Sequence, residues 1–317
     1  LLEGDSNIYY SEADVDLTPR LSTATFKSLN KIMFTGAAPI TSTEGVEVRD
    51  SQGNILELDQ VMLDESSSTI VALLKENISL EDSYTIAKEG FKDAIEVSFT
   101  GLFDSEEFND AFYYEGDDLG FTYSKDITSF RVWAPTASHV VLNLYEAGSG
   151  DNLIEQIDMT RDVKGTWVAD VSGDLNLTYY TYEVTVSGQT NEAVDPYARA
   201  VGVNGNRAMV VDLDLTDPEN WSSDVSPEFS GTPTDAVIYE LHMRDWSSHE
   251  SAGFKNIGKF LQFTEEGATD HLTDLGITHL HLLPAFDHRS IDETKLDEPQ
   301  FNWGYDPQNY NVPEGSY

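Results

Sequence analysis

The sequence contains no cysteine, few basic residues and no long apolar run, and each absence excludes a class of protein. Without cysteine, the chain has neither a disulfide framework nor thiolate chemistry. Only 18 Lys and Arg residues stand against 57 Asp and Glu residues, so the formal net charge is -39. Such a surface repels nucleic acid and anionic lipid, and we expect neither as a partner. No run of about 18 apolar residues is present, so we expect no membrane insertion.

The composition nevertheless provides enough apolar material for packed domains. Hydrophobic residues make up 39% of the 317 residues, and aromatic residues make up 11%. This content argues against global disorder. The length exceeds that of one typical core, so two or three domains are expected.

The first two thirds of the chain have the texture of short strands separated by turns. Apolar, β-branched and aromatic residues gather in segments 68–74, 129–134, 139–146, 165–171 and 179–186. Clusters of Gly, Asn and Asp separate such segments about every ten residues, a spacing typical of β-sandwiches. The sequence therefore predicts two Ig-like β-sandwich domains in this part of the chain.

Two polar stretches indicate where these domains end. The acidic stretch 104–118 predicts a domain boundary, although a short helix or an extension of an edge strand would also fit it. Residues 226–235 contain the Pro, Gly and Ser of a linker. We therefore place the first sandwich at residues 1–108 and the second at residues 109–230.

The remaining segment, residues 231–317, has a different pattern. Two apolar runs, 236–243 and 277–286, predict buried strands, and 263–276 between them predicts a helix. Thr264 is a suitable N-cap for that helix and Gly276 a suitable stop. A strand, a helix and a strand form a βαβ unit, whose parallel strands are expected to be buried on both faces.

Two histidines on the second apolar run could act as metal ligands. His279 and His281 lie two residues apart, so they share one face of a strand. That spacing could bind zinc, but no third ligand lies at a suitable spacing. The favoured interpretation is that both rings line the core with hydrogen-bonded nitrogens, and no metal site is predicted.

An aromatic stretch, residues 301–317, follows the second run and is expected to be a loop. In parallel α/β folds the loops after the strands form the ligand-binding face. Trp303 and Tyr305 offer flat faces for stacking, and Asn302 and Asp306 offer hydrogen bonds to hydroxyl groups. This combination suits a sugar ring, although both aromatic rings could instead only fill a long loop.

Aromatic residues of the second sandwich could form a starch-binding platform, but they indicate it less clearly than the aromatic stretch 301–317 indicates a sugar site. Trp133 and Trp167 lie within strand patterns, where core packing is the commoner outcome. Tyr197 lies outside such a pattern. We expect this sandwich to have a structural role.

Several segments together resemble type I pullulanases, starch-debranching enzymes of the α-amylase superfamily (glycoside hydrolase family 13). FNWGYDPQNYNVPEGSY (301–317) is similar to the signature YNWGYDP…Y…PEGSY of that family. VIYELHMRDWS (237–247) and GITHLHLLPAFD (276–287) resemble its first two barrel strands. FRVWAPTASHVVLNLY (130–145) and VDPYARAVGVNG (194–205) resemble the starch-associated sandwich called carbohydrate-binding module 48. The resemblance covers roughly residues 110–317.

The resemblance implies that residues 231–317 begin a (β/α)8 TIM barrel that cleaves α-1,6 linkages by a retaining mechanism. The catalytic carboxylates of the family lie on later strands, so no catalytic residue is expected in this chain. Tyr305 matches the tyrosine that stacks under the sugar at the cleavage point, with Asn302 and Asp306 beside it and Trp303 along the same wall. Phe301 replaces the usual tyrosine and lacks its hydroxyl group.

The resemblance also implies partners and a location. An α-glucan would be the substrate, and the remainder of the enzyme would be a companion fragment, separated by a nick or a truncation after Tyr317. No cofactor is required; acid-rich loops could bind Ca²⁺, although no EF-hand spacing is present. A polymeric substrate implies an extracellular or cell-surface bacterial enzyme. Two alternatives remain open: an isoamylase or glycogen-debranching relative, and a non-catalytic polysaccharide-binding module.

Overall fold

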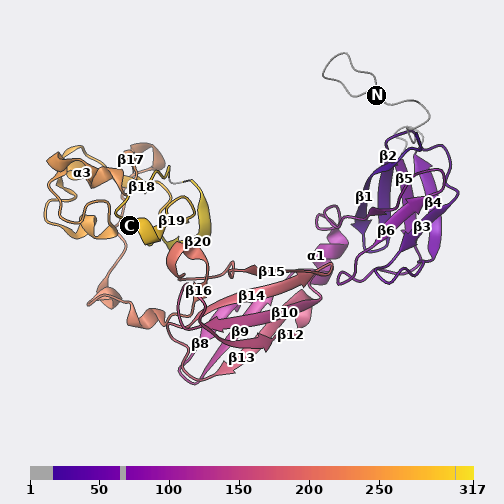
Figure 1. Ribbon diagram of the computed structural model, residues 1–317. Helices are drawn as coiled ribbons and strands as arrows, with labels where there is room; N and C mark the ends of the chain where they lie inside the picture. The colour runs from indigo at the N-terminus through magenta and orange to yellow at the C-terminus, as the bar shows by residue number, and fades with distance from the viewer. Residues whose placement is uncertain (1–16, 65–68, 304) are drawn as a thin grey trace, which may run out of the picture.

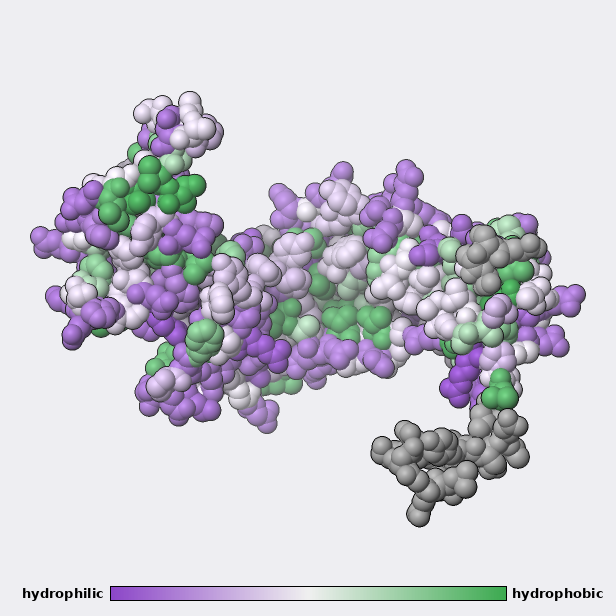
Figure 2. All heavy atoms as spheres, turned by 90° about the horizontal axis from the view of Figure 1, so that it is seen from above, coloured by the Kyte–Doolittle hydropathy of each residue, from purple (hydrophilic) through white to green (hydrophobic). Residues whose placement is uncertain are grey.

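The computed structural model describes residues 17–64, 69–303 and 305–317, which form three groups of strands along the chain (Figure 1). The first and third groups lie at the two ends of the molecule, with the second between them. Hydrophilic residues cover much of the surface of all three groups in the space-filling view (Figure 2). The fold is mostly β-sheet, as expected, and the described residues include no helix long and apolar enough to cross a membrane.

The first group consists of two antiparallel sheets that face one hydrophobic core. Alternate residues point into it, and Ile32 and Phe34 on one strand and Ile70 and Ala72 on the next are buried. The four-stranded sheet has the order β1 (Leu21–Ser28), β2 (Lys31–Gly36), β5 (Thr69–Leu74), β4 (Leu58–Asp64), and the three-stranded sheet has the order β3 (Val46–Arg49), β6 (Thr85–Lys88), β7 (Ile95–Glu96).

A short helix, α1 (Glu106–Phe112), connects the first group to the second. The Ser105 side chain caps it by accepting a hydrogen bond from the Phe108 amide, and Phe108 packs into the first core. Among the interpretations of the acidic stretch 104–118, the short helix is confirmed. The boundary expected at residue 108 falls inside this helix.

The second group also contains two antiparallel sheets around a shared core. The side chains of Phe130, Leu142, Trp167 and Tyr180 are buried in it. One sheet has the order β11 (Leu153–Asp158), β10 (His139–Tyr145), β14 (Tyr179–Val186), β15 (Gln189–Ala193), with β16 (Ala208–Met209) also on β14; the other has the order β12 (Thr160–Arg161), β13 (Thr166–Ser172), β9 (Ile127–Trp133), β8 (Gly120–Tyr123). All five predicted strand segments are confirmed as strands.

A buried carboxylate lies in the second core. Asp195 accepts hydrogen bonds from the Tyr180 hydroxyl at 2.7 Å and from the Tyr197 amide at 2.8 Å. Burial raises the pKa of Asp195 despite these donors. The hydrogen bonds satisfy a group that would otherwise be costly to bury.

The third group begins with a parallel pair, β17 (Ile238–Leu241) and β18 (His279–Leu282), as predicted. The predicted helix 263–276 is wrong in extent, because only α3 (Asp270–Asp274) is α-helical. Thr264 ends a 3-10 helix instead of capping an α-helix. The next residue, Glu265, has an extended backbone, and its carboxylate accepts hydrogen bonds from the Lys255 and Asn256 amides.

The other short elements are helical turns. They are α2 (Asp245–Ser248), η2 (Val163–Gly165), η3 (Val203–Gly205), η4 (Leu213–Leu215), η5 (Trp221–Ser223), η6 (Pro233–Asp235), η7 (Glu250–Ala252), η8 (Phe260–Thr264) and η9 (Glu293–Lys295). Of these turns, η6 lies in the predicted linker, residues 226–235, and the side chains of that segment are exposed.

The expectation that the parallel strands are buried on both faces is wrong for the described residues. All four residues of β18 are exposed, because no second layer of the described chain covers this sheet. The core placement of the two histidines is therefore also wrong. His279 pairs with Thr278, and His281 lies 3.2 Å from Glu240.

The aromatic stretch is not entirely a loop, because β20 (Pro307–Pro313) pairs antiparallel with β19 (Phe286–His288). Val312 of β20 is buried in the core of the second group. Tertiary pairing and this burial determine a strand that the local sequence does not indicate.

A set of hydrogen bonds joins η3 of the second group to η9 and β20. The Asn204 amide donates to Glu293 Oε2 at 2.6 Å, and the Glu293 amide donates to Asn204 Oδ1 at 2.7 Å. The Asn309 side chain donates to the Gly205 carbonyl at 3.0 Å. A Cβ atom at Gly205 would lie 2.4 Å from Asp287 Oδ2, so only glycine allows this approach. We call these contacts the Asn204 joint.

A buried ion pair lies beside this joint. His288 Nδ1 contacts Glu314 Oε2, which also accepts a hydrogen bond from the His288 amide. Burial alone would lower the pKa of His288, but the contact with Glu314 raises it overall. Burial likewise opposes charge on Glu314, but the His288 and Ser316 donors lower its pKa overall.

We predict that Asn204→Ala loosens the contact between η3 and the β19–β20 hairpin. The free energy of local opening should fall by roughly 1–3 kcal/mol, because the side-chain hydrogen bonds of Asn204 with the Glu293 backbone amide and with Asp292 Oδ1 are lost. Amide hydrogen exchange of β19 and β20 measures this change. Asn206→Ala, at an exposed neighbouring position, is the control. Unchanged exchange in Asn204→Ala would contradict the role of the joint.

We also predict that Glu314→Gln lowers the pKa of His288, because burial then acts without the hydrogen bond and the charge of Glu314. In the unaltered protein, the raised pKa of His288 stabilises the fold below pH about 6.5, and this contribution disappears as the pH rises through the folded pKa. NMR titration of the His288 ring measures both values. An equal pKa in the two proteins would be inconsistent with the ion pair.

Candidate functional site

The four predicted site residues, Asn302, Trp303, Tyr305 and Asp306, lie in the segment between η9 and β20. Residue 304, which was not among them, lies outside the described residues. Trp303 and Tyr305 are exposed, at 70% and 59% of their surface. Neither ring is turned into a core. The rings of Phe301 and Trp303 meet edge to face, with their centroids 6.5 Å apart. The described part of this loop therefore presents its aromatic side chains to solvent.

Asn302 and Asp306 hold the two ends of this loop together. Asn302 Nδ2 donates to Asp306 Oδ1 at 2.8 Å and also to the Ser290 hydroxyl. The Arg289 amide donates to the Asp306 carbonyl at 3.2 Å. Both amide hydrogens of Asn302 are used within the loop, whereas its carbonyl oxygen has no hydrogen-bond partner in the described residues. Part of the polar capacity expected to face a ligand is therefore used to shape the loop.

Tyr305 lies beside the carboxyl end of β18, in a hollow of about 450 Å³. The hollow is lined by Glu240, His281, Tyr305 and the apolar segment 282–286. Glu240 and His281 come from the two parallel strands and form the 3.2 Å pair described above. The structure thus brings Tyr305 to the strand ends, where the sequence predicted it, but Trp303 does not line this hollow.

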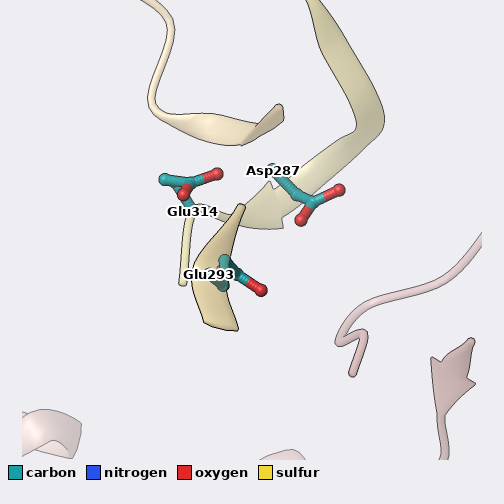
Figure 3. Close-up of side chains that lie close together, drawn as sticks. All are labelled: Asp287, Glu293 and Glu314. Carbon is teal, nitrogen blue, oxygen red and sulfur yellow. The ribbon is translucent and has the colours of Figure 1, made fainter. Parts of the chain in front are cut away.

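Three carboxylates that the sequence did not indicate as site residues lie close together (Figure 3). Asp287 of β19, Glu293 of η9 and Glu314 after β20 place ligand atoms within 4.8 Å of one another. Burial, together with the charges of Glu314 and Glu293, raises the pKa of Asp287. Oxygen ligands at this spacing suit a hard cation such as Ca²⁺. All three carboxylates already accept hydrogen bonds from the protein.

The tryptophans of the second group have different environments. Trp167 is buried in the second core, as predicted. Trp133 ends β9 and is 41% exposed, so its predicted core placement is wrong. Its ring nitrogen donates to the carbonyls of Phe112 and Lys164, which hold the ring at the surface. Tyr197 is also exposed.

Comparison with known proteins gives a consistent result. Residues 118–198 match the model of carbohydrate-binding module 48 (isoamylase N-terminal domain). The chain is 38% identical over 241 residues to the pullulanase of Bacillus subtilis, a match that covers 73% of this chain and 32% of the relative. A pullulanase of Klebsiella pneumoniae is 28% identical over 313 residues.

Solved structures agree with these sequences. The pullulanase from Bacillus acidopullulyticus matches with a TM-score of 0.84 and 30% identity, covering 94% of this chain and 51% of that one. The pullulanase from Paenibacillus barengoltzii, solved with maltohexaose and alpha-cyclodextrin, matches with a TM-score of 0.65 and 51% identity, covering 68% of this chain and 35% of that one.

This chain therefore spans about a third to a half of the length of these relatives. Its described strands and the five segments that resemble this family in sequence agree with the same family. The chain belongs to the type I pullulanase family of the α-amylase superfamily and corresponds to the N-terminal part of these proteins.

Proposed function

We propose that this chain forms part of a glycoside hydrolase that cleaves α-1,6 branch linkages in pullulan, amylopectin and limit dextrins. The position of Tyr305 carries this proposal. Its exposed ring lies at the ends of two parallel strands, in a hollow with Glu240 and His281. A flat aromatic face next to polar groups suits a pyranose ring, which has an apolar face and a rim of hydroxyl groups. The identity to pullulanases supports this choice of substrate.

The proposed division of the chain has three parts. Residues 1–108 form an Ig-like sandwich, and residues 109–230 form a module-48-like sandwich that supports polysaccharide binding. Residues 231–317 begin a (β/α)8 barrel. The two separate cores support the first two parts. The parallel pairing of β17 and β18, with α3 between them in sequence, supports the third.

The barrel proposal also accounts for the exposed faces of the parallel strands. Ile238 of β17 and Leu280 and Leu282 of β18 are apolar and exposed in the described chain. Further barrel strands and helices from the remainder of the enzyme, as a companion fragment or a continuation, would cover them. The retaining pair of carboxylates would come from those later strands, so no residue here is assigned to bond cleavage.

Tyr305 would then act by stacking under the glucose unit at the cleavage point. Stacking that strengthens as the ring flattens toward an oxocarbenium ion accelerates the reaction as well as binding substrate. Trp303 would extend the same wall. Asn302 and Asp306 would hold the loop in shape through their side-chain hydrogen bond. The enzyme would act outside the cell or at its surface, because such polymers do not enter cells.

An isoamylase-type debranching enzyme is the second candidate. The isoamylase SU1 of Zea mays is 25% identical to this chain over 226 residues. That identity is lower than the 38% found for the Bacillus subtilis pullulanase. Assays of the complete enzyme on pullulan and on glycogen separate the two candidates. Faster cleavage of glycogen than of pullulan would favour the isoamylase type.

We predict that Tyr305→Ala in the complete enzyme lowers kcat/KM on pullulan at least about tenfold, or about 1.4 kcal/mol. The lost interaction is the stacking of the ring on the reacting sugar. Tyr305→Phe, which keeps the ring, should retain most of the activity and serves as the matched control. If Tyr305→Ala leaves kcat/KM unchanged, the role of this residue is refuted.

A further inference from the structure

A second aromatic groove lies far from Tyr305, where α1 meets the second group. It has a volume of about 510 Å³. The end of α1 and the segment after it contribute Asn109, Phe112 and Tyr113, and the second group contributes Trp133 and Tyr197. In Figure 1, α1 lies at one end of the second group and the β19–β20 hairpin at the other.

Three rings of this groove are open to solvent. Tyr113 is 64% exposed, Tyr197 is 50% exposed and Trp133 is 41% exposed. An isolated exposed aromatic residue needs no explanation, but three that converge on one concave surface indicate a binding site. The described residues provide no hydrogen-bond partner for the hydroxyl groups of Tyr113 and Tyr197, and both side chains are exposed, so these hydroxyl groups are available to a ligand.

The Trp133 ring is held in place before any ligand binds. The Trp133 ring nitrogen donates to the Phe112 carbonyl at 2.9 Å and to the Lys164 carbonyl at 3.1 Å. The Phe108 ring meets Trp133 edge to face, with centroids 6.3 Å apart. Little conformational entropy would be lost when a ligand stacks on a ring fixed in this way.

The neighbouring residue, Tyr114, is held as firmly. The Arg131 guanidinium lies 5.3 Å from the centre of its ring. The Tyr114 hydroxyl donates to Asp118, which also pairs with Arg131 at 2.9 Å. This ion pair anchors the segment that carries Tyr113, so the wall of the groove is rigid on that side as well.

The groove continues beyond Tyr113 into a second, more polar hollow of about 670 Å³. Asn109, Tyr113 and Tyr114 line both hollows, and the second adds Glu115 and Lys164. The Lys164 ammonium already donates to the Asp110 carbonyl. Carboxylates, an amide and hydroxyl groups along an aromatic floor suit a neutral polyol, whereas an anion would be repelled.

We propose that this groove binds an α-glucan chain at a site separate from the Tyr305 hollow. The choice of α-glucan rests on the proposed function. The match to carbohydrate-binding module 48 covers Trp133 and Tyr197 but begins after Tyr113, at residue 118. From outside the module, α1 thus supplies the Asn109 amide and the segment after it supplies the Tyr113 ring. The site is complete only when α1 is docked on the second group.

The test is calorimetric titration of the 317-residue chain with maltoheptaose. Tyr113→Ala should weaken binding about tenfold, because a stacking ring is lost. Tyr113→Phe should weaken binding less than Tyr113→Ala, because it keeps the stacking ring and removes only the hydroxyl group. Trp221→Ala, which removes an exposed tryptophan in the segment before the linker, is the matched control and should leave the affinity unchanged.

Two results would refute the proposal that this groove binds an α-glucan. One is no binding at millimolar maltoheptaose, and the other is equal affinity in Tyr113→Ala and the unaltered chain. Tyr305→Ala in the same titration separates the two sites. Binding lost only in Tyr305→Ala would reject the groove and leave the proposed function intact. If the complete enzyme fails to cleave pullulan while Tyr113→Ala still weakens the binding of maltoheptaose, the proposed function is refuted and the groove is supported as a binding site.

Discussion

The reciprocal hydrogen bonds between Asn204 and Glu293 are the contact on which the arrangement of the third group depends. They fix η9 against the second group, and Val312 anchors β20 in the second core. The segment between η9 and β20 is thereby held at both ends. Its aromatic side chains are exposed on a supported loop, so the position of Tyr305 follows from contacts made by other residues.

The joint also illustrates how an acidic chain accommodates its charges. Asp287, Glu293 and Glu314 lie within 4.8 Å of one another, where mutual repulsion is substantial. Amide and imidazole donors from the protein offset this cost, among them Asn309 and His288. A partly satisfied polar network in such a place is strongly destabilising, whereas a satisfied one rigidifies its surroundings.

The two aromatic surfaces follow one structural principle. Tyr305 lies on a loop closed by the Asn302–Asp306 hydrogen bond, and Trp133 is fixed by two bonds to backbone carbonyls. In each case polar side-chain groups hold the backbone or ring, and the apolar face remains open to solvent.

Sequence alone predicted five strands of the first two groups and the parallel pair of the third, because these depend on local periodicity and composition. Tertiary structure decided the rest. β20 is a strand because it pairs with β19, and helix 263–276 is shortened to α3 where the Glu265 carboxylate binds distant amides. The exposure of Trp133 depends on carbonyls from α1 and η2. Partners distant in sequence leave no local pattern, so only the folded chain reveals them.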